Sequence, residues 1–399
     1  MKSPKSQITM IIIVGLVLFI LVGIIFYISK SAFKKTAQQG IKTTQTTALN
    51  TQPIKEFVSK CQDKLAKEAI NLIGKQGGYI YKSQGGDLID YSDGDQGKFF
   101  IIYDGNKVAY NIRQPHSYSV FPYSSVAPDY PWKLFPYKDI SLSDKTFEGI
   151  FGLSNVPPLN ISQGPNSLQS QVQDYIDNKM QDCVDLRPFV SEGYDFNLNK
   201  SRTTVTLASS DVRIKTVMPI KISNIATGEQ TYIDTFSSTI NVRLKEMYYF
   251  VNNLVGSDIG KITFNLKDDT NNKNAFRINV KENSFSKDDI VIVTDDKSQI
   301  SGKPFEYRFA RKNRAPALYY INPDSLTLSL GPSGEVVITK HVLLSGMDLQ
   351  AEDPDEDTLN FNIDPDIPLT VDKPETIIFN VAVSDGQLSD YQQITVKVT

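Results

Sequence analysis

The chain has 399 residues, of which 40% are hydrophobic and 22% are charged, and its formal net charge is -3. This composition is typical of folded domains, and the length allows two or three of them. Lysine and arginine are not concentrated in any stretch, which argues against nucleic acid as a partner. With two histidines and two cysteines, the side chains that usually serve as general bases, nucleophiles or zinc ligands are scarce, so we expect a protein that is not an enzyme.

A long apolar segment near the N-terminus predicts a membrane anchor within residues 1–35. Residues 6–29 carry no charge, and the apolar run Ile8–Ile28 lies inside them. Crossing a bilayer takes about 20 apolar residues, whereas a cleaved signal peptide has an apolar core of about 7–15. Lysines flank the run on both sides, so charge does not determine its orientation. The cysteine pair and two Asn-x-Ser sequons, at Asn160 and Asn199, favour a body outside the cytoplasm.

The chain begins with MKSPKSQITMIIIVGLVLF. This start resembles the class III signal of archaeal pilin-like proteins, in which a short basic leader ends before Gln and an apolar helix follows. The resemblance implies cleavage before Gln7 and, as an alternative to a permanent anchor, a pilin-like filament subunit. Ser6 and Ile11 stand where that signal usually has Gly and Glu.

A flexible stalk and an α+β domain are predicted after the anchor. Residues 36–53 are rich in Thr, Gln and Ala and show no sustained apolar periodicity, which is typical of a linker. The domain over 54–185 contains two segments with apolar residues at helical spacing. We therefore predict one amphipathic helix over 54–73 and a second over 168–183.

The two cysteines, Cys61 and Cys183, fall on the apolar faces of these predicted helices. Outside the cytosol we expect a disulfide between them, and closing a loop of about 120 residues would contribute roughly 4–5 kcal/mol. Two buried free thiols are the alternative. Two features are similar to uncharacterised membrane-anchored proteins of small-genome archaea: the first helix followed by Gly77-Gly78-Tyr79, and the second helix with its cysteine. This resemblance implies no activity.

An aromatic and proline-rich stretch lies between the two helices. Tyr, Phe and the only Trp alternate with Pro there, which is typical of a long ordered loop. The alternative is a surface that binds peptide or sugar, whose candidate residues are Tyr130, Trp132, Phe135 and Tyr137. A further alternative is an envelope glycan hydrolase, which acts through two carboxylates. Asp129 and Asp139 are the candidates for this pair.

Residues 186–312 are predicted to form a β-rich α+β domain. Val212–Ile222 shows two-residue alternation, and Ala226–Glu229 predicts the turn to a returning strand. A helix is expected near 243–255. Further strands are expected near 261–266, 274–280, 289–294 and 304–310. No Gly-rich phosphate loop or nucleophile elbow occurs in this sequence, so nothing in it indicates catalysis.

After a basic linker, short alternating strands over 313–399 predict an antiparallel β-sandwich. The chain as a whole is therefore expected to be α+β. Three motifs occur in order, NRAP from Asn313, AEDPDEDTL from Ala351 and VSDGQLSD from Val383. They resemble the cadherin-like and immunoglobulin-like repeats of prokaryotic surface proteins. The resemblance implies a sandwich that serves as an adhesive or spacer module.

The acidic motif predicts a calcium site. Asp353, Asp355 and Asp357 alternate, so on an extended backbone their carboxylates would project to one side. Calcium takes oxygen ligands and would accept these three together with Asp385. The alternative is a solvated acidic loop. Taken together, we expect a single-pass cell-membrane protein whose extracytoplasmic body binds protein or glycan at the cell surface, with calcium as its one candidate cofactor.

Overall fold

The computed structural model describes residues 50–115 and 151–399, and its fold is α+β, as predicted. Within these residues no helix is both long and apolar enough to cross a membrane. The predicted span, Ile8–Ile28, lies outside the described residues.

Helix α2 (Gln52–Lys75) confirms the first predicted helix and extends it by two residues at each end. Pro53 lies in its first turn, where the backbone N–H needs no intrahelical partner. Gly74 faces strand β10, because a Cβ at this position would collide with the backbone oxygen of Glu306. The buried residues recur every three or four positions: Ile54, Val58, Cys61, Leu65, Ala69 and Ile73.

Helix α3 (Leu168–Cys183) coincides with the second predicted helix. It begins at Ser167, whose hydroxyl oxygen accepts the backbone N–H of Ser170 and so caps the first turn. The helix packs against α2. Cys61 and Cys183 form a disulfide with a Cα–Cα distance of 5.8 Å, which confirms the predicted bridge.

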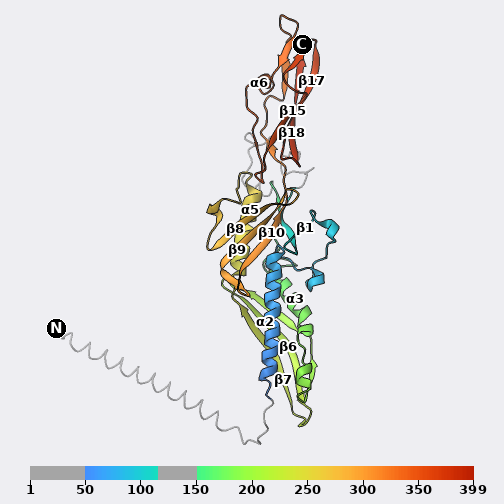
Figure 1. The fold of residues 1–399 in the computed structure, drawn as a ribbon, viewed down its shortest axis with the longest axis vertical. Helices are drawn as coiled ribbons and strands as arrows, with labels where there is room; N and C mark the ends of the chain where they lie inside the picture. The colour runs from blue at the N-terminus through green and yellow to red at the C-terminus, as the bar shows by residue number, and fades with distance from the viewer. Residues whose placement is uncertain (1–49, 116–150) are drawn as a thin grey trace, which may run out of the picture. The chain divides into compact units, whose positions relative to one another are not determined.

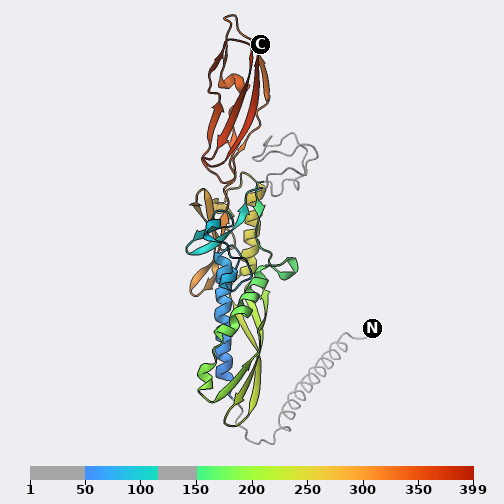
Figure 2. The same cartoon turned by 90° about the vertical axis from the view of Figure 1, so that its right-hand side faces the viewer.

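The two helices cover one face of an antiparallel sheet. In Figure 1 and Figure 2, α2 and α3 lie along the same side of this sheet, against β7 and β5 respectively. The predicted alternation is confirmed, since Val212, Ile214, Met218, Ile220 and Ile222 are buried. The sheet consists of β4 (Tyr194–Leu198), β5 (Arg202–Leu207), β6 (Val212–Asn224) and β7 (Gln230–Ile240), with β6 paired to all three others.

A second sheet combines strands from both halves of the body. Strand β2 pairs in parallel with β10, so the segments 54–185 and 186–312 share one sheet. Helix α2 packs against β10 as well as β7 and so contacts both sheets. In order, the strands are β1 (Phe100–Tyr103), β2 (Asn106–Arg113), β10 (Lys303–Arg311), β9 (Asp288–Ile300) and β8 (Phe276–Phe285), with β3 (Leu153–Ser154) beside β2.

Helix α5 (Leu244–Gly260) confirms the third expected helix, but the strand expected near 261–266 is wrong. Turns follow α5 instead, and Ile262 and Leu266 are buried from irregular backbone. Ile262, Phe264 and Leu266 are spaced by two residues, as in a strand, yet no strand among the described residues pairs with this segment. Among the described residues of the body, the remaining short helices are α4 (Arg187–Val190) and the 3-10 turns Lys82–Gln84, Asp93–Asp95, Ile161–Gln163 and Asp269–Asn271.

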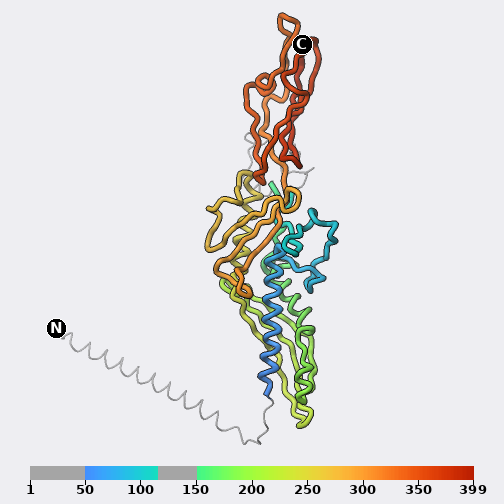
Figure 3. The backbone as a smooth tube through the Cα atoms, in the orientation of Figure 1, coloured from blue at the N-terminus to red at the C-terminus, as the bar shows by residue number. Residues whose placement is uncertain are grey.

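The C-terminal module begins after β10, and Figure 3 shows the backbone continuing from that strand into it. Its main sheet has the order β12-β18-β17-β15, in which β12 runs parallel to β18 and the other pairs are antiparallel. The elements are β11 (Ala317–Leu318), β12 (Ser325–Leu328), β13 (Val336–Ile338), α6 (Lys340–Leu343), β14 (Ala351–Glu352), β15 (Asn360–Asp364), β16 (Leu369–Val371), β17 (Glu375–Ser384) and β18 (Ser389–Val398).

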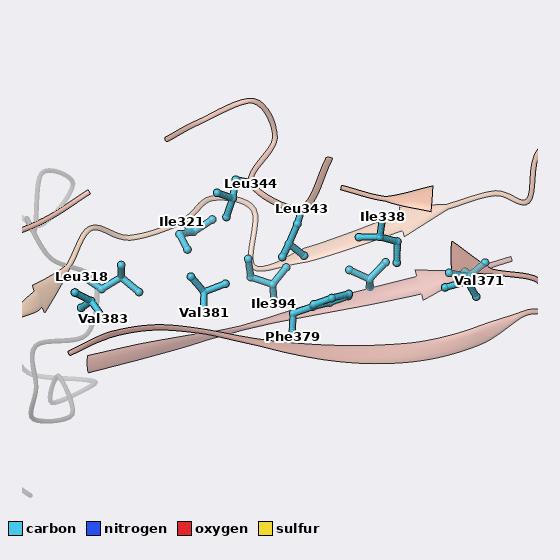
Figure 4. Packing of buried hydrophobic residues seen from close by; sticks show 12 residues of the cluster. Leu318, Ile321, Ile338, Leu343, Leu344, Val371, Phe379, Val381, Val383 and Ile394 are labelled. Carbon is cyan, nitrogen blue, oxygen red and sulfur yellow. The ribbon is translucent and has the colours of Figure 1, made fainter. Parts of the chain in front are cut away.

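One apolar cluster forms the core of this module. Figure 4 shows Phe379 of β17 and Ile394 of β18 close to Leu343 of α6. Alternate residues of β17 and β18 enter the cluster, as their two-residue spacing predicts. Leu359 and Ile363 pack against the cluster, whereas Phe361 of β15, which lies between them, is 43% exposed.

Candidate functional site at the junction

The predicted functional residues are distributed over several parts of the chain. Gln7, the aromatic residues Tyr130 to Tyr137 and the carboxylates Asp129 and Asp139 lie outside the described residues. Of the two sequons, Asn160 is half-buried before a 3-10 turn, and Asn199 is exposed between β4 and β5. The four predicted calcium ligands lie in two turns of the C-terminal module near the linker, with Asp353, Asp355 and Asp357 in one and Asp385 in the other.

The acidic motif forms a turn rather than the extended segment that was expected. Asp353 Oδ1 accepts the backbone N–H groups of Asp355 at 2.8 Å and Asp357 at 3.1 Å. An aspartate that bonds to backbone N–H groups shortly after it in the chain is the usual start of such a turn. Asp385 starts a similar turn between β17 and β18, because its Oδ1 accepts the N–H groups of Gln387 and Leu388.

Two buried arginines tie this turn to the body. Arg314, which is 0% exposed, places Nη2 at 2.8 Å from Asp355 Oδ1 and 2.9 Å from Asp258 Oδ2. Arg311 lies beside it, with Nη2 at 2.6 Å from Asp258 Oδ1 and Nε at 3.1 Å from Asp355 Oδ1. Asp258 belongs to α5, whereas Asp355 belongs to the module. Buried charges of this kind need their partners, since removing one leaves an uncompensated charge in the interior.

Three further side chains at the junction each have one buried oxygen without a hydrogen-bond partner among the described residues: Asn313 Oδ1, Asp353 Oδ2 and Asp357 Oδ2. The other polar atom of each is engaged. Asn313 Nδ2 donates to Asp385 Oδ2 at 2.9 Å, and Asp357 Oδ1 lies 3.2 Å from Lys287 Nζ. Unpartnered buried oxygens are costly, and a bound cation is one way to satisfy them.

Burial raises the pKa of three carboxyl groups at the junction. Burial, and next the charge of Asp355, raise the pKa of Asp353 to about 7. Burial raises the pKa of Asp289 to about 6 although Arg311 lies near it. Burial likewise raises the pKa of Asp357, against the effect of Lys287. A divalent cation would reverse these shifts, because it favours the ionised carboxylates.

The structure brings the predicted residues together unevenly. Asp355 faces two guanidinium groups, so its charge is already neutralised. Asp357 donates its backbone N–H to Asp353, whereas Asp385 accepts from the side-chain amide of Asn313. Across residues 50–115 and 151–399, no three His, Cys, Asp or Glu side chains are arranged to hold a metal ion by themselves.

Sequence reasoning missed Asn313, Lys287 and Asp289 as members of this site. Asn313 opens the linker motif and so carried a local signal, but Lys287 and Asp289 come from the hairpin between β8 and β9 and carried none. No protein-family model matches the chain, and no curated protein matches its sequence.

Proposed function

We propose that this is a single-pass, membrane-anchored cell-surface protein whose extracytoplasmic body binds or adheres to a protein or glycan, and whose junction binds calcium. Three observations support this function. The apolar run Ile8–Ile28 is long enough to span a membrane. The disulfide suits an oxidising compartment outside the cytosol. The C-terminal module consists mostly of antiparallel strand pairs, and its motifs resemble those of immunoglobulin-like or cadherin-like sandwiches.

The observation that carries the calcium proposal is the set of three buried, unpartnered oxygens of Asn313, Asp353 and Asp357. Calcium takes six to eight oxygen ligands, amide oxygens included, and tolerates irregular geometry. Asp385 is the fourth protein ligand that we propose. The ion pair between Lys287 and Asp357 would break when calcium binds the carboxylate of Asp357. The cation would thereby join the linker, the acidic turn and the β17–β18 turn, and hold a binding body at a fixed angle to its module.

A calcium titration of the full chain in mild detergent tests this proposal. We expect a rise in the thermal midpoint with a dissociation constant on the order of 10⁻⁴–10⁻³ M, the range of extracellular calcium modules. Asp353→Asn and Asp357→Asn should abolish the response. Asp372→Asn, which alters an exposed aspartate of the same module, should leave it unchanged. An equal response from Asp353→Asn, or none at 10 mM calcium, would refute the site.

The location and processing of the N-terminus need a separate experiment. On intact cells, an added protease should cleave the body if it lies outside, and a body protected until the cells are lysed would overturn the outward assignment. N-terminal sequencing of the purified chain then distinguishes anchor from filament. A mature protein beginning at Gln7 favours the pilin-like filament subunit, and an uncleaved chain favours the anchor.

A further inference from the structure

A cleft of about 430 Å³ lies beside β2, on the body and apart from the junction residues described above. Its walls come from the segment after α2, from β2 itself and from the loop that follows β3. The volume falls within the range of small-molecule and saccharide-sized sites. Four tyrosines and three prolines contribute to its lining: Tyr79, Tyr81, Tyr91, Tyr110, Pro157, Pro158 and Pro165.

The cleft presents an exposed aromatic platform. The rings of Tyr91 and Phe99 stack with their centroids 4.3 Å apart and their planes 10° apart. Phe99 is 41% exposed, which is unusual for a large apolar side chain that could pack inward as its neighbour Phe100 does. Tyr81 meets the ring of Tyr91 edge to face at 6.5 Å. Aromatic surfaces of this kind offer large, rigid contact area to the apolar face of a ligand.

Two cations line the cleft and no acidic residue among the described ones does. Lys98 and Arg113 are exposed, and neither forms an ion pair within the described part of the chain. Burial raises the pKa of Tyr79 to about 12, and the positive charge of Arg113 opposes this effect. Among the described residues, the cleft thus has two cations without an ion-pair partner and no carboxylate, which favours an anionic ligand.

Two tyrosine hydroxyls of the cleft already donate their protons to the protein, so toward a ligand they can act only as acceptors. Tyr79 Oη donates to the backbone oxygen of Asn155 at 2.7 Å, and Tyr81 Oη donates to that of Lys107 at 3.3 Å. Asn155 Nδ2 in turn donates to the backbone oxygen of Tyr110, which leaves its side-chain oxygen as an acceptor. Because each phenol has one proton, these hydroxyls can only accept from a ligand. They suit a ligand rich in donors, and a proline-rich peptide has few, since proline lacks an N–H.

We infer that this cleft binds an acidic saccharide, a sugar chain that bears carboxylates. Its carbon–hydrogen faces would stack on Phe99 and Tyr91, its hydroxyls would donate to the tyrosine and asparagine oxygens, and its carboxylates would pair with Lys98 and Arg113. The inference rests on the proposed function in one respect, because the ligand would be met outside the cytoplasm. Binding in the cleft does not require calcium at the junction.

Calorimetric titration of the full chain in mild detergent with the trisaccharide of galacturonic acid tests the inference. The buffer contains a calcium chelator, so that failure of the junction site cannot affect the result. We expect saturable binding that weakens as salt is added. A neutral trisaccharide of galactose should bind roughly tenfold more weakly, as the loss of a charged contact implies. Equal binding of the two sugars, or tighter binding of a polyproline peptide, would overturn the inference.

Variants assign the binding to the cleft. Phe99→Ala should weaken binding roughly tenfold, as truncating an aromatic anchor does. Phe361→Ala is the matched control, because this phenylalanine is 43% exposed but belongs to the C-terminal module. Lys98→Gln and Arg113→Gln alter exposed side chains and should remove the preference for the acidic sugar. Unchanged binding by Phe99→Ala, or an equal loss in Phe361→Ala, would refute the assignment.

Discussion

Replacing Arg314 with methionine should destabilise the protein by about 3–5 kcal/mol, the usual cost of removing one partner from a buried ion pair. Methionine has a similar length but no charge and no donors. Arg314 contacts Asp355 at 2.8 Å and Asp258 at 2.9 Å, and the change removes both contacts. Arg311 then remains as the cation that neutralises the two aspartates. It also removes donors from the backbone oxygens of Phe151, at 2.9 Å, and Pro354, at 2.8 Å. Each of these groups would remain buried.

Urea unfolding of the full chain in mild detergent, followed by circular dichroism, measures this loss. Arg187→Met is the matched control, because Arg187 also pairs with an aspartate, at 2.6 Å, but its side chain is 88% exposed. An exposed pair contributes about 0–1 kcal/mol. The double variant Arg314→Met/Asp355→Leu should cost less than the sum of its single changes, since it removes both charges of one pair. If Arg314→Met costs no more than Arg187→Met, the junction network does not hold the module to the body.

Three further predictions concern backbone packing, the disulfide and pH. Gly74→Ala should destabilise the protein by about 1–3 kcal/mol through overpacking. Gly256→Ala, in helix α5 and facing open space, should stabilise it by up to about 1 kcal/mol. Urea unfolding measures both variants, and equal effects would contradict the packing of α2 on β10. Replacing Cys61 and Cys183 by alanine should cost about 2–5 kcal/mol in the same assay, and no loss would show that the bridge is dispensable. Calcium affinity should rise steeply from pH 5 to pH 7.5, because calcium must displace the proton of Asp353, whose pKa is about 7; a flat profile would exclude Asp353 as a ligand.

The raised pKa of Asp353 also sets the sign of a stability change without calcium. The folded protein binds this proton more tightly than the unfolded chain, whose carboxyl has an ordinary pKa of 3.8. The contribution of this group to the free energy of unfolding is therefore largest below about pH 4 and is lost as pH rises through about 7. Asp353→Asn should flatten that dependence in chelator-treated protein, and an unchanged slope would contradict it.

Local pattern predicted the elements whose burial follows from periodicity. The helical spacing of apolar residues predicted α2 and α3 almost to the residue, and two-residue alternation predicted the buried face of β6. The disulfide followed because both cysteines lie on apolar faces that need a covering element. The same logic failed at 261–266, because spacing alone cannot show whether a partner strand is present.

The sequence by itself determined the α+β class, the apolar N-terminal run, the disulfide pair and the acidic motif, since each depends on residues that are close in the chain or few in number. The tertiary structure decided the parallel pairing of β2 with β10, the burial of Arg314 between α5 and the acidic turn, and the cleft around Tyr91 and Phe99. These features bring together residues that are distant in the chain. No periodicity records such contacts, because they arise only when separate elements pack.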